Sequence, residues 1–164
     1  MRILAIDPGL TRCGVGVVDV DAQRRNAFAG VHVVRTDPAA DLAERLLSLD
    51  RQLCSLMDEY APDAVAVERV FSQLNVRTAM GTAQASAVAI LAAAQRGLPT
   101  YSYTPTEVKA AVTGYGRADK SQVTLMVTRL LRLERPPSPA DAADALALAL
   151  CHAMKSPRAQ VLAR

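Results

Sequence analysis

Three β-rich runs in succession open this chain, and their order largely decides its fold. They span residues 3–6, 14–20 and 28–35, with short turn-like or polar breaks between them, which is the pattern of an antiparallel meander. Strand-like and helix-like segments alternate from there on, and strands joined through helices lie parallel. The sequence therefore predicts an α/β fold with a mixed five-stranded sheet, an antiparallel meander plus parallel strands, covered by helices.

The later segments are marked by apolar periodicity and by helix-start signals. Leucines recur at helical spacing over residues 41–60, and residues 78–96 are alanine-rich and small-sided almost all round. Thr104-Pro105-Thr106-Glu107 has the form of a capping box with proline at the first helical position. The remaining strands are expected at 64–67 and 100–103, and further helices at 105–112, 119–133 and 138–154.

Length and composition favour one compact domain. A chain of 164 residues with 51% hydrophobic content can bury one sizeable core and is short for two. We expect residues 1–155 to form this domain and residues 156–164 to be a flexible tail. The N-terminal residues lack a signal-peptide pattern, and no stretch approaches the roughly 18 apolar residues of a membrane span. A soluble, cytoplasmic protein without membrane contact is expected.

Cysteine and charge content say what kind of ligand to expect. Cys13, Cys54 and Cys151 are far apart and lack the paired spacing of a zinc or redox site, so we expect reduced core residues. The net charge of +3 says little alone. If four of the 16 acidic residues line one metal site, 12 remain against 19 basic residues, and the rest of the surface suits phosphates.

Four carboxylates stand out by their position. Asp7 and Glu68 directly follow two apolar strand runs, where a charged side chain can enter a cleft at the sheet edge. Asp141 and Asp144 share one face of the last helix, which is otherwise alanine and leucine up to residue 150. A helix that is apolar on its other faces must be packed. The two aspartates should therefore stand where this helix meets the rest of the domain.

Each acid also has a structural interpretation that the sequence leaves open. Asp7 before Pro-Gly is a common turn residue, Glu68 could be a strand-end surface charge, and Asp141 fits the first turn of a helix, where a negative charge favours the dipole. Asp144 has no such local explanation. If the four converge, each pair at about 4 Å repels by roughly 4 kcal/mol at an effective dielectric near 20. Four carboxylates would balance two Mg²⁺ or Mn²⁺ ions, the arrangement used for phosphodiester cleavage.

The chain resembles the RuvC family through motifs that occur in order over nearly its whole length. These motifs are Ile6-Asp7-Pro8-Gly9, Gly14-Val15-Gly16-Val17, Val67-Glu68-Arg69-Val70-Phe71, Val108-Lys109, Lys120-Ser121-Gln122-Val123, and Asp141-Ala142-Ala143-Asp144-Ala145-Leu146-Ala147. The resemblance implies a ribonuclease H-like fold and a homodimer that makes paired, symmetric nicks in Holliday (four-way) junction DNA, in recombination and repair. It also implies ends with 5′-phosphate and 3′-hydroxyl, and cooperation with the RuvAB branch-migration complex.

The family pattern also assigns roles to individual residues. It places the acidic, metal-binding and catalytic site on Asp7, Glu68, Asp141 and Asp144, and it matches Phe71 to an aromatic near the unpaired bases of the crossover. A stacked base is worth about 1 to 3 kcal/mol; the alternative is that Phe71 anchors its loop in the core. Lys109, Arg117 and Lys120 are interpreted as phosphate contacts that position the junction, with solvated surface charge as the alternative. The alanine-rich segment could pack against a symmetry mate.

The match departs from the family after Phe71. Gln84-Ala85-Ser86-Ala87 stands where Gln-Ala-Arg-Gly is frequent, and Leu74 stands where a basic residue is frequent, which puts the contacts of those basic residues in doubt. Three other functions share parts of this sequence pattern. A sugar kinase or actin-type phosphotransferase needs about twice this length. A non-catalytic module that binds branched DNA would be favoured by loss of one of the four acids, and none is missing. A nuclease of the same fold with another substrate, such as an RNA–DNA hybrid, is opposed only by the family motifs.

Overall fold

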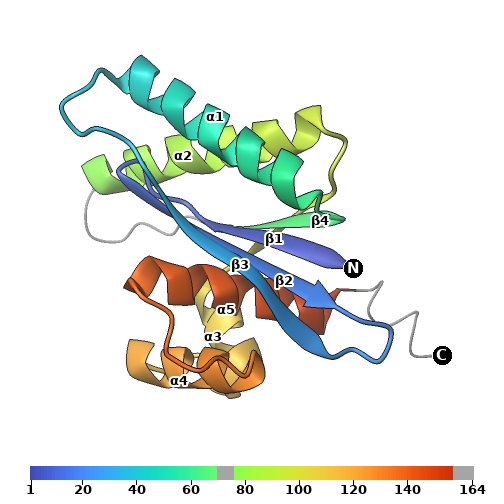
Figure 1. The fold of residues 1–164 in the computed structure, drawn as a ribbon. Coiled ribbons are helices and arrows are strands. Elements are labelled where there is room, and N and C mark those ends of the chain that lie inside the picture. Colours follow the sequence, from blue (N-terminus) through green and yellow to red (C-terminus); the bar gives the residue numbers. More distant parts are fainter. Residues whose placement is uncertain (70–75, 157–164) are drawn as a thin grey trace.

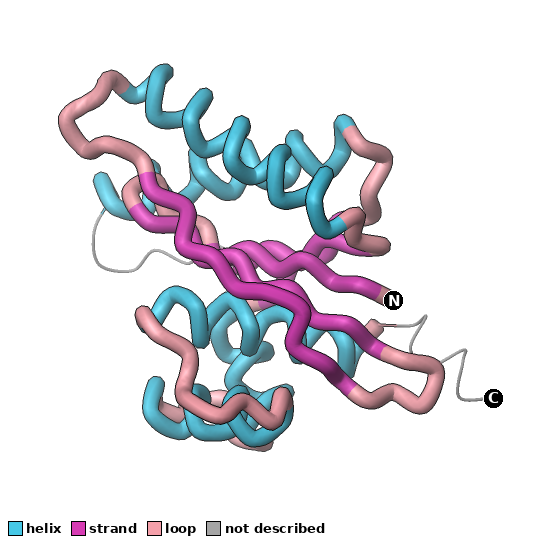
Figure 2. The backbone as a smooth tube through the Cα atoms, in the orientation of Figure 1, coloured by secondary structure: helices cyan, strands magenta, loops and turns pink. Residues whose placement is uncertain are grey.

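The computed structural model describes residues 1–69 and 76–156, which form a five-stranded sheet between two layers of helices (Figure 1, Figure 2). β1 pairs antiparallel with β2, and β2 with β3, whereas the β1–β4 and β4–β5 pairs are parallel. The predicted mixed sheet, a meander plus parallel strands, is confirmed. The strand order is β3-β2-β1-β4-β5, with bounds β1 Arg2–Asp7, β2 Arg12–Val20, β3 Asn26–Arg35, β4 Ala64–Glu68 and β5 Thr100–Tyr103.

The helices divide between the two faces of the sheet. α1 (Leu42–Tyr60) and α2 (Val76–Gln95) cover one face, and α3 (Pro105–Thr113), α4 (Lys120–Leu130) and α5 (Ala140–Lys155) cover the other (Figure 1). Each layer closes its own apolar core against the sheet. None of these described helices has the length and apolarity to cross a lipid bilayer.

The central strand β1 serves both cores because its side chains alternate between the faces. Leu4 and Ile6 lie in the core under α1 and α2, and Ile3 and Ala5 lie in the core with α3, α4 and α5. All four are fully buried, which explains why β1 is a continuous apolar run in the sequence. A strand buried in this way has its C-terminal residue, Asp7, fixed at the edge of the sheet.

The helix α5 is buried almost all round, as its sequence predicts. Its residues from Ala145 to Cys151 are fully buried, and it contacts β1, β2, β3, β4, α3 and α4. Glycines on β2 permit this close approach. A Cβ added at Gly16 would lie 2.8 Å from the carbonyl carbon of Ala145, and one at Gly14 would overlap the backbone oxygen of Asp141. The backbone of α5 therefore rests directly on the backbone of β2.

The helix ends agree with the capping signals in two cases and differ in two. Capping boxes are present at Thr104–Glu107 and at Asp119–Gln122, as the sequence predicts for the first of these and suggests for the second. The expected end of α4 near residue 133 is wrong, because the helix stops at Leu130 and Arg132 adopts a left-handed φ of 52°. The last helix, α5, begins at Ala140 rather than at the expected residue 138, and Pro139 is its N-cap, without a side-chain bond.

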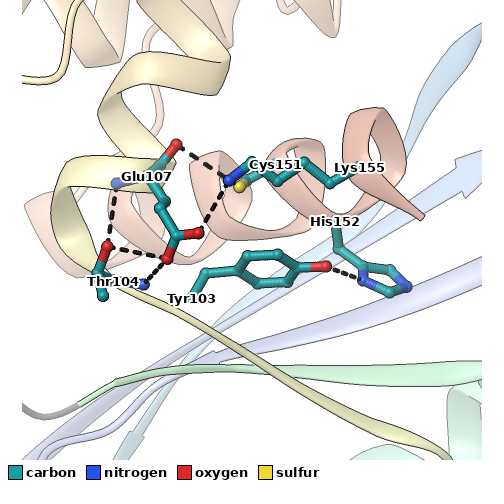
Figure 3. A network of polar contacts seen from close by, with 6 residues as sticks. All are labelled: Tyr103, Thr104, Glu107, Cys151, His152 and Lys155. Atoms are coloured by element: carbon teal, nitrogen blue, oxygen red, sulfur yellow. Dashed lines mark hydrogen bonds and ion pairs between the residues drawn. The ribbon is translucent and has the colours of Figure 1, made fainter. Parts of the chain in front are cut away.

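Polar contacts tie the C-terminal half of α5 to β5 and α3 (Figure 3). Tyr103 Oη and His152 Nδ1 share a hydrogen bond of 2.8 Å, and Lys155 Nζ lies 3.1 Å from Glu107 Oε1. The Glu107 carboxylate also accepts from the Thr104 N–H, and these bonds lower its pKa to about 2. These contacts anchor the C-terminal end of α5.

The cysteines follow the prediction in two of three positions. Cys13 and Cys151 are buried. Cys54 is only partly buried, and its Sγ lies 3.1 Å from the Arg96 guanidinium, so the core placement expected for it is wrong. It lies on a helix face where a charged side chain covers it, and apolarity alone does not reveal such a cover.

Candidate functional site

Asp7 and Glu68 meet because β1 and β4 are parallel neighbours. The register pairs Ile6 with Val67, so the next residue of each strand emerges at the same edge of the sheet. Both side chains are only partly exposed there. The parallel pairing therefore brings together two carboxylates that are 61 positions apart in the chain.

Asp141 and Asp144 reach the same edge from α5. Gly14 of β2 lies opposite Asp7 in the β1–β2 register, and the backbone oxygen of Asp141 occupies the space where a side chain on Gly14 would stand. The first turn of α5 is thus held beside the end of β1. Asp144, three residues on, lies on the same face of the helix.

The four acids line one pocket of about 340 Å³, which we call the acid pocket. Lys109 of α3 and Lys120 of α4 share this lining, so β1, β4, α3, α4 and α5 all contribute to it. No histidine or cysteine belongs to the lining among the described residues. The remaining lining residues are Pro105, Val108, Val123 and Ala147.

The environment of the two strand-end acids raises their pKa values. Burial, followed by the charges of Asp144 and Asp141, raises the pKa of Asp7 to about 7. Burial, followed by the charges of Asp7 and Asp144, raises the pKa of Glu68 to about 7. Carboxylates that raise one another's pKa share a field that a cation would relieve.

Two cationic side chains of the protein already form ion pairs with the two helix acids. Arg12 holds Asp141 Oδ2 from Nε at 2.8 Å and from Nη2 at 2.5 Å, and Lys120 Nζ lies 2.9 Å from Asp144 Oδ2. Over residues 1–69 and 76–156, no group of three or more His, Cys, Asp or Glu side chains is arranged as a finished metal-binding set. The acid pocket therefore contains four carboxylates, but their present arrangement is not that of a complete metal coordination sphere.

The donor chemistry of the acid pocket fits hard divalent cations. Carboxylate oxygens are the ligands that Mg²⁺ and Mn²⁺ take, and soft sulfur or imidazole donors are missing from the described lining. Four carboxylates carry the charge to balance two such ions. Asp7, Glu68, Asp141 and Asp144 are the residues that would hold them, after Arg12 and Lys120 yield their partners.

The residues expected to bind nucleic acid are placed unevenly. Lys109 and Lys120 line the acid pocket, with Lys120 engaged to Asp144. Arg117 is exposed in the turn before α4 and does not line the pocket. Phe71 and Leu74 lie outside the described residues. Sequence reasoning missed Arg12, although its position five residues after Asp7, at the start of the next strand, was an available signal.

The fold and the acid pocket together define a class. Acids at the ends of two neighbouring parallel strands, faced by acids on a helix across the sheet, make this a ribonuclease H-like protein with a site suited to metal-dependent phosphodiester hydrolysis. Comparison with known proteins agrees at the level of family. Residues 3–152 match the family model described as crossover junction endodeoxyribonuclease RuvC.

Individual relatives extend the match over the whole chain. The crossover junction endodeoxyribonuclease RuvC of Salinispora arenicola is 68% identical over 152 residues, which is 93% of this chain and 87% of the relative. That of Streptomyces avermitilis is 64% identical over 157 residues, 96% and 89% of the two chains. Thermus thermophilus RuvC, solved in complex with a Holliday junction substrate, superposes with a TM-score of 0.90 at 36% identity over 96% of each chain. The chain belongs to the RuvC family, the crossover junction endodeoxyribonucleases, which are metal-dependent hydrolytic nucleases.

Proposed function

We propose that this endonuclease resolves Holliday junctions by paired, symmetric nicks, each made in the acid pocket of one subunit of a homodimer. The observation that carries the proposal is the convergence of Asp7, Glu68, Asp141 and Asp144 with two lysines in one pocket. Carboxylates and lysines side by side suit a site that takes up both divalent cations and the phosphates of DNA. The work of such an enzyme is recombination and DNA repair in the cytoplasm, with residues 1–155 as one nuclease domain.

The four carboxylates would hold two Mg²⁺ or Mn²⁺ ions against the scissile phosphate. Bound divalent ions at such a site lower the pKa of a water and stabilise the leaving oxygen. Asp7 and Glu68, fixed on β1 and β4, set the depth of the site, and Asp141 and Asp144 close it from α5. Lys120 lies next to Asp144 Oδ2, where its ammonium would neutralise a phosphate oxygen. Attack of water that breaks the P–O3′ bond leaves a 5′-phosphate and a 3′-hydroxyl, whereas breaking the P–O5′ bond would leave a 3′-phosphate. The ligatable ends that the family resemblance implies carry 5′-phosphate and 3′-hydroxyl. The 3′ oxygen would therefore be the leaving group.

The helix α2 is the surface we assign to the dimer. Its small residues allow another helix to approach closely, and it leaves apolar side chains exposed: Val76 is 79% and Leu91 56% accessible. A two-fold interface would let two acid pockets face the two-fold symmetric junction.

The family resemblance supports further roles for individual residues. We assign Phe71 to stacking on a base at the crossover, and Lys109 and Arg117 to contacts with phosphates. We also assign the RuvAB branch-migration complex as a partner.

Cleavage of a synthetic mobile four-way junction tests this proposal. The protein is incubated with the junction, matched linear duplex and an RNA–DNA hybrid, in Mg²⁺ or Mn²⁺, alongside Asp7→Asn. Metal-dependent paired nicks near the crossover are expected, and Asp7→Asn should slow them by about 100-fold or more, as loss of a group that stabilises transition-state charge does.

Glu59→Gln is the matched control, because Glu59 is an exposed acid on α1 outside the acid pocket. It should cleave like the parent. Tight junction binding without cleavage in either metal would replace the proposal with a non-catalytic branched-DNA module. Cutting of the hybrid in preference to the junction would keep the acid pocket and overturn the substrate.

A further inference from the structure

A second concavity lies next to the acid pocket, and the proposed chemistry does not use it. It has a volume of about 710 Å³ and is formed by the Gly9–Arg12 loop between β1 and β2, by Leu42 and Arg45 at the start of α1, and by the first turns of α2. We call it the Arg45 groove. It is larger than the acid pocket.

The described lining of the Arg45 groove combines cationic, hydroxyl and apolar side chains, and it includes no aspartate or glutamate. Its polar members are Arg12, Arg45, Thr11, Thr78, Thr82 and Gln84, and its apolar members are Leu10, Leu42 and Met80. Guanidinium, hydroxyl and amide groups are the side chains that contact phosphate and sugar oxygens in nucleic-acid complexes. The absence of acid from this described lining contrasts with the acid pocket beside it.

Arg45 is held in place without losing its charge. Its Nε donates to Thr36 Oγ1 at 3.0 Å and its Nη2 donates to Thr11 Oγ1 at 2.7 Å, and Thr36 Oγ1 in turn donates to the Leu10 carbonyl. Within the part of the chain that the structure describes, no carboxylate lies at ion-pair distance from Arg45, whereas Arg2, Arg12, Arg25 and Arg96 each have one. A fixed guanidinium with neutral acceptors keeps a full positive charge for an outside anion.

The groove is connected to the acid pocket through Arg12. This residue lines the Arg45 groove, and its guanidinium also reaches Asp141 of the acid pocket. The loop that lines the groove is therefore linked to the acid pocket by the ion pair between Arg12 and Asp141. A DNA strand with its scissile phosphate at Asp7 would have its neighbouring phosphates within reach of this loop.

We infer that the Arg45 groove binds the sugar-phosphate backbone of the DNA strand leading away from the cleaved phosphate, with Arg45 as a fixed phosphate contact. The inference rests on the proposed function, because it takes the acid pocket as the cutting site. It adds a binding surface on the α1 side of the β1–β2 loop. Phosphate contact of this kind is independent of base sequence, so it contributes to junction and duplex arms alike.

Binding of an uncut junction as a function of salt tests the inference. In an Asp7→Asn background with Mg²⁺, Arg45→Gln should weaken junction binding about tenfold, the effect of losing one hydrogen bond to a charged group. The slope of log K against log salt should become less steep by about 0.9, the value for one lost phosphate contact. Arg45→Lys keeps the charge and should keep the slope.

Arg51→Gln is the matched control, since Arg51 is an exposed arginine of the same helix that does not line the groove. It should leave the affinity and the slope unchanged. Equal losses in Arg45→Gln and Arg45→Lys with a lowered Tm would overturn the inference, because Arg45 would then only brace the loop through Thr11 and Thr36. An unchanged slope in Arg45→Gln would overturn it as well. Neither result touches the Asp7→Asn cleavage test, so the two proposals fail separately.

Discussion

Individual charges in the acid pocket are balanced in a way that the four acids alone do not suggest. Asp141 and Asp144 are each paired with a cation from another element, Arg12 of β2 and Lys120 of α4. Among the ion pairs of residues 1–69 and 76–156, none involves Asp7 or Glu68, and burial raises the pKa of both to about 7. Before metal binding, two of the acids are thus paired with cations of the protein. The other two have raised pKa values, so each is only partly ionised near neutral pH.

Arg12 should compete with divalent cations for Asp141. Replacing it by glutamine frees the carboxylate, and an exposed ion pair of this kind is worth about 0.2 to 1 kcal/mol. We expect Arg12→Gln to bind Mn²⁺ more tightly, by up to about fivefold, in a calorimetric titration without DNA. Arg25→Gln breaks an exposed pair with Asp21 outside the pocket and should not change the affinity. Weaker Mn²⁺ binding in Arg12→Gln would mean that Arg12 positions Asp141 for metal.

At the scale of elements, much of the fold could be predicted because local signals and tertiary demands agree. Three features can be seen directly in the sequence: the buried apolar run of β1, the capping box at Thr104, and the apolar residues on nearly all faces of α5. The end of α4 could not be predicted, since a left-handed Arg132 has no marker of its own. The start of α5 likewise differs from the expected residue 138, because Pro139 takes the N-cap position although proline has no side-chain acceptor for a cap.

The seating of α5 on β2 is the element contact on which the acid pocket depends. Gly16→Ala adds a Cβ that meets the backbone of Ala145 and Leu146 at 2.8 Å, so the helix must shift. We expect a loss of about 1 to 3 kcal/mol in the free energy of unfolding. Junction cleavage should fall about tenfold or more, because small displacements of catalytic groups are costly. Urea unfolding and cleavage at a temperature where the variant is folded measure the two effects.

Gly81→Ala is the control for Gly16→Ala. A Cβ at Gly81 of α2 meets only Leu10 side-chain atoms, at 3.5 Å or more. Its stability should be unchanged or higher by up to about 1 kcal/mol, because alanine is the better helix former. Normal cleavage and stability in Gly16→Ala would show that α5 tolerates displacement from the sheet.

At the scale of the whole molecule, the site joins residues from the beginning, middle and end of the chain. Position after a strand and spacing on a helix were enough to single out the four acids, and the fold brings all four into one pocket. Arg12 and the Arg45 groove could not be predicted in the same way. Their importance comes from what lies across from them in space. Arg12 stands close to Asp7 in the sequence, but its pairing with Asp141, 129 positions away, depends on the fold, and nothing in the local sequence of α1 marks Arg45.

If α2 forms the dimer interface, a variant that is monomeric should still nick single strands but should lose the paired nicks within one junction. Leu91→Glu places a charge on the exposed apolar side chain of α2 and should give a monomer in analytical ultracentrifugation. The acid pocket is untouched, so nicking of single strands should persist. Paired nicks within one junction should fall about 100-fold, the lower end of the gain that linking two binding modules gives. Leu125→Glu on α4 carries the same change at a site 50% exposed, and it should remain dimeric. A dimeric Leu91→Glu would move the interface elsewhere.

Gly14 and Gly16 also decide what kind of inhibitor the enzyme can accept. At Gly14 and Gly16 the main chain of β2 contacts the main chain of α5, next to Asp141 of the acid pocket. Side chains can change rotamer to admit a bulky compound, and two contacting backbones cannot. A small molecule aimed at this enzyme must therefore fit the roughly 340 Å³ that the pocket offers or grow outward toward solvent.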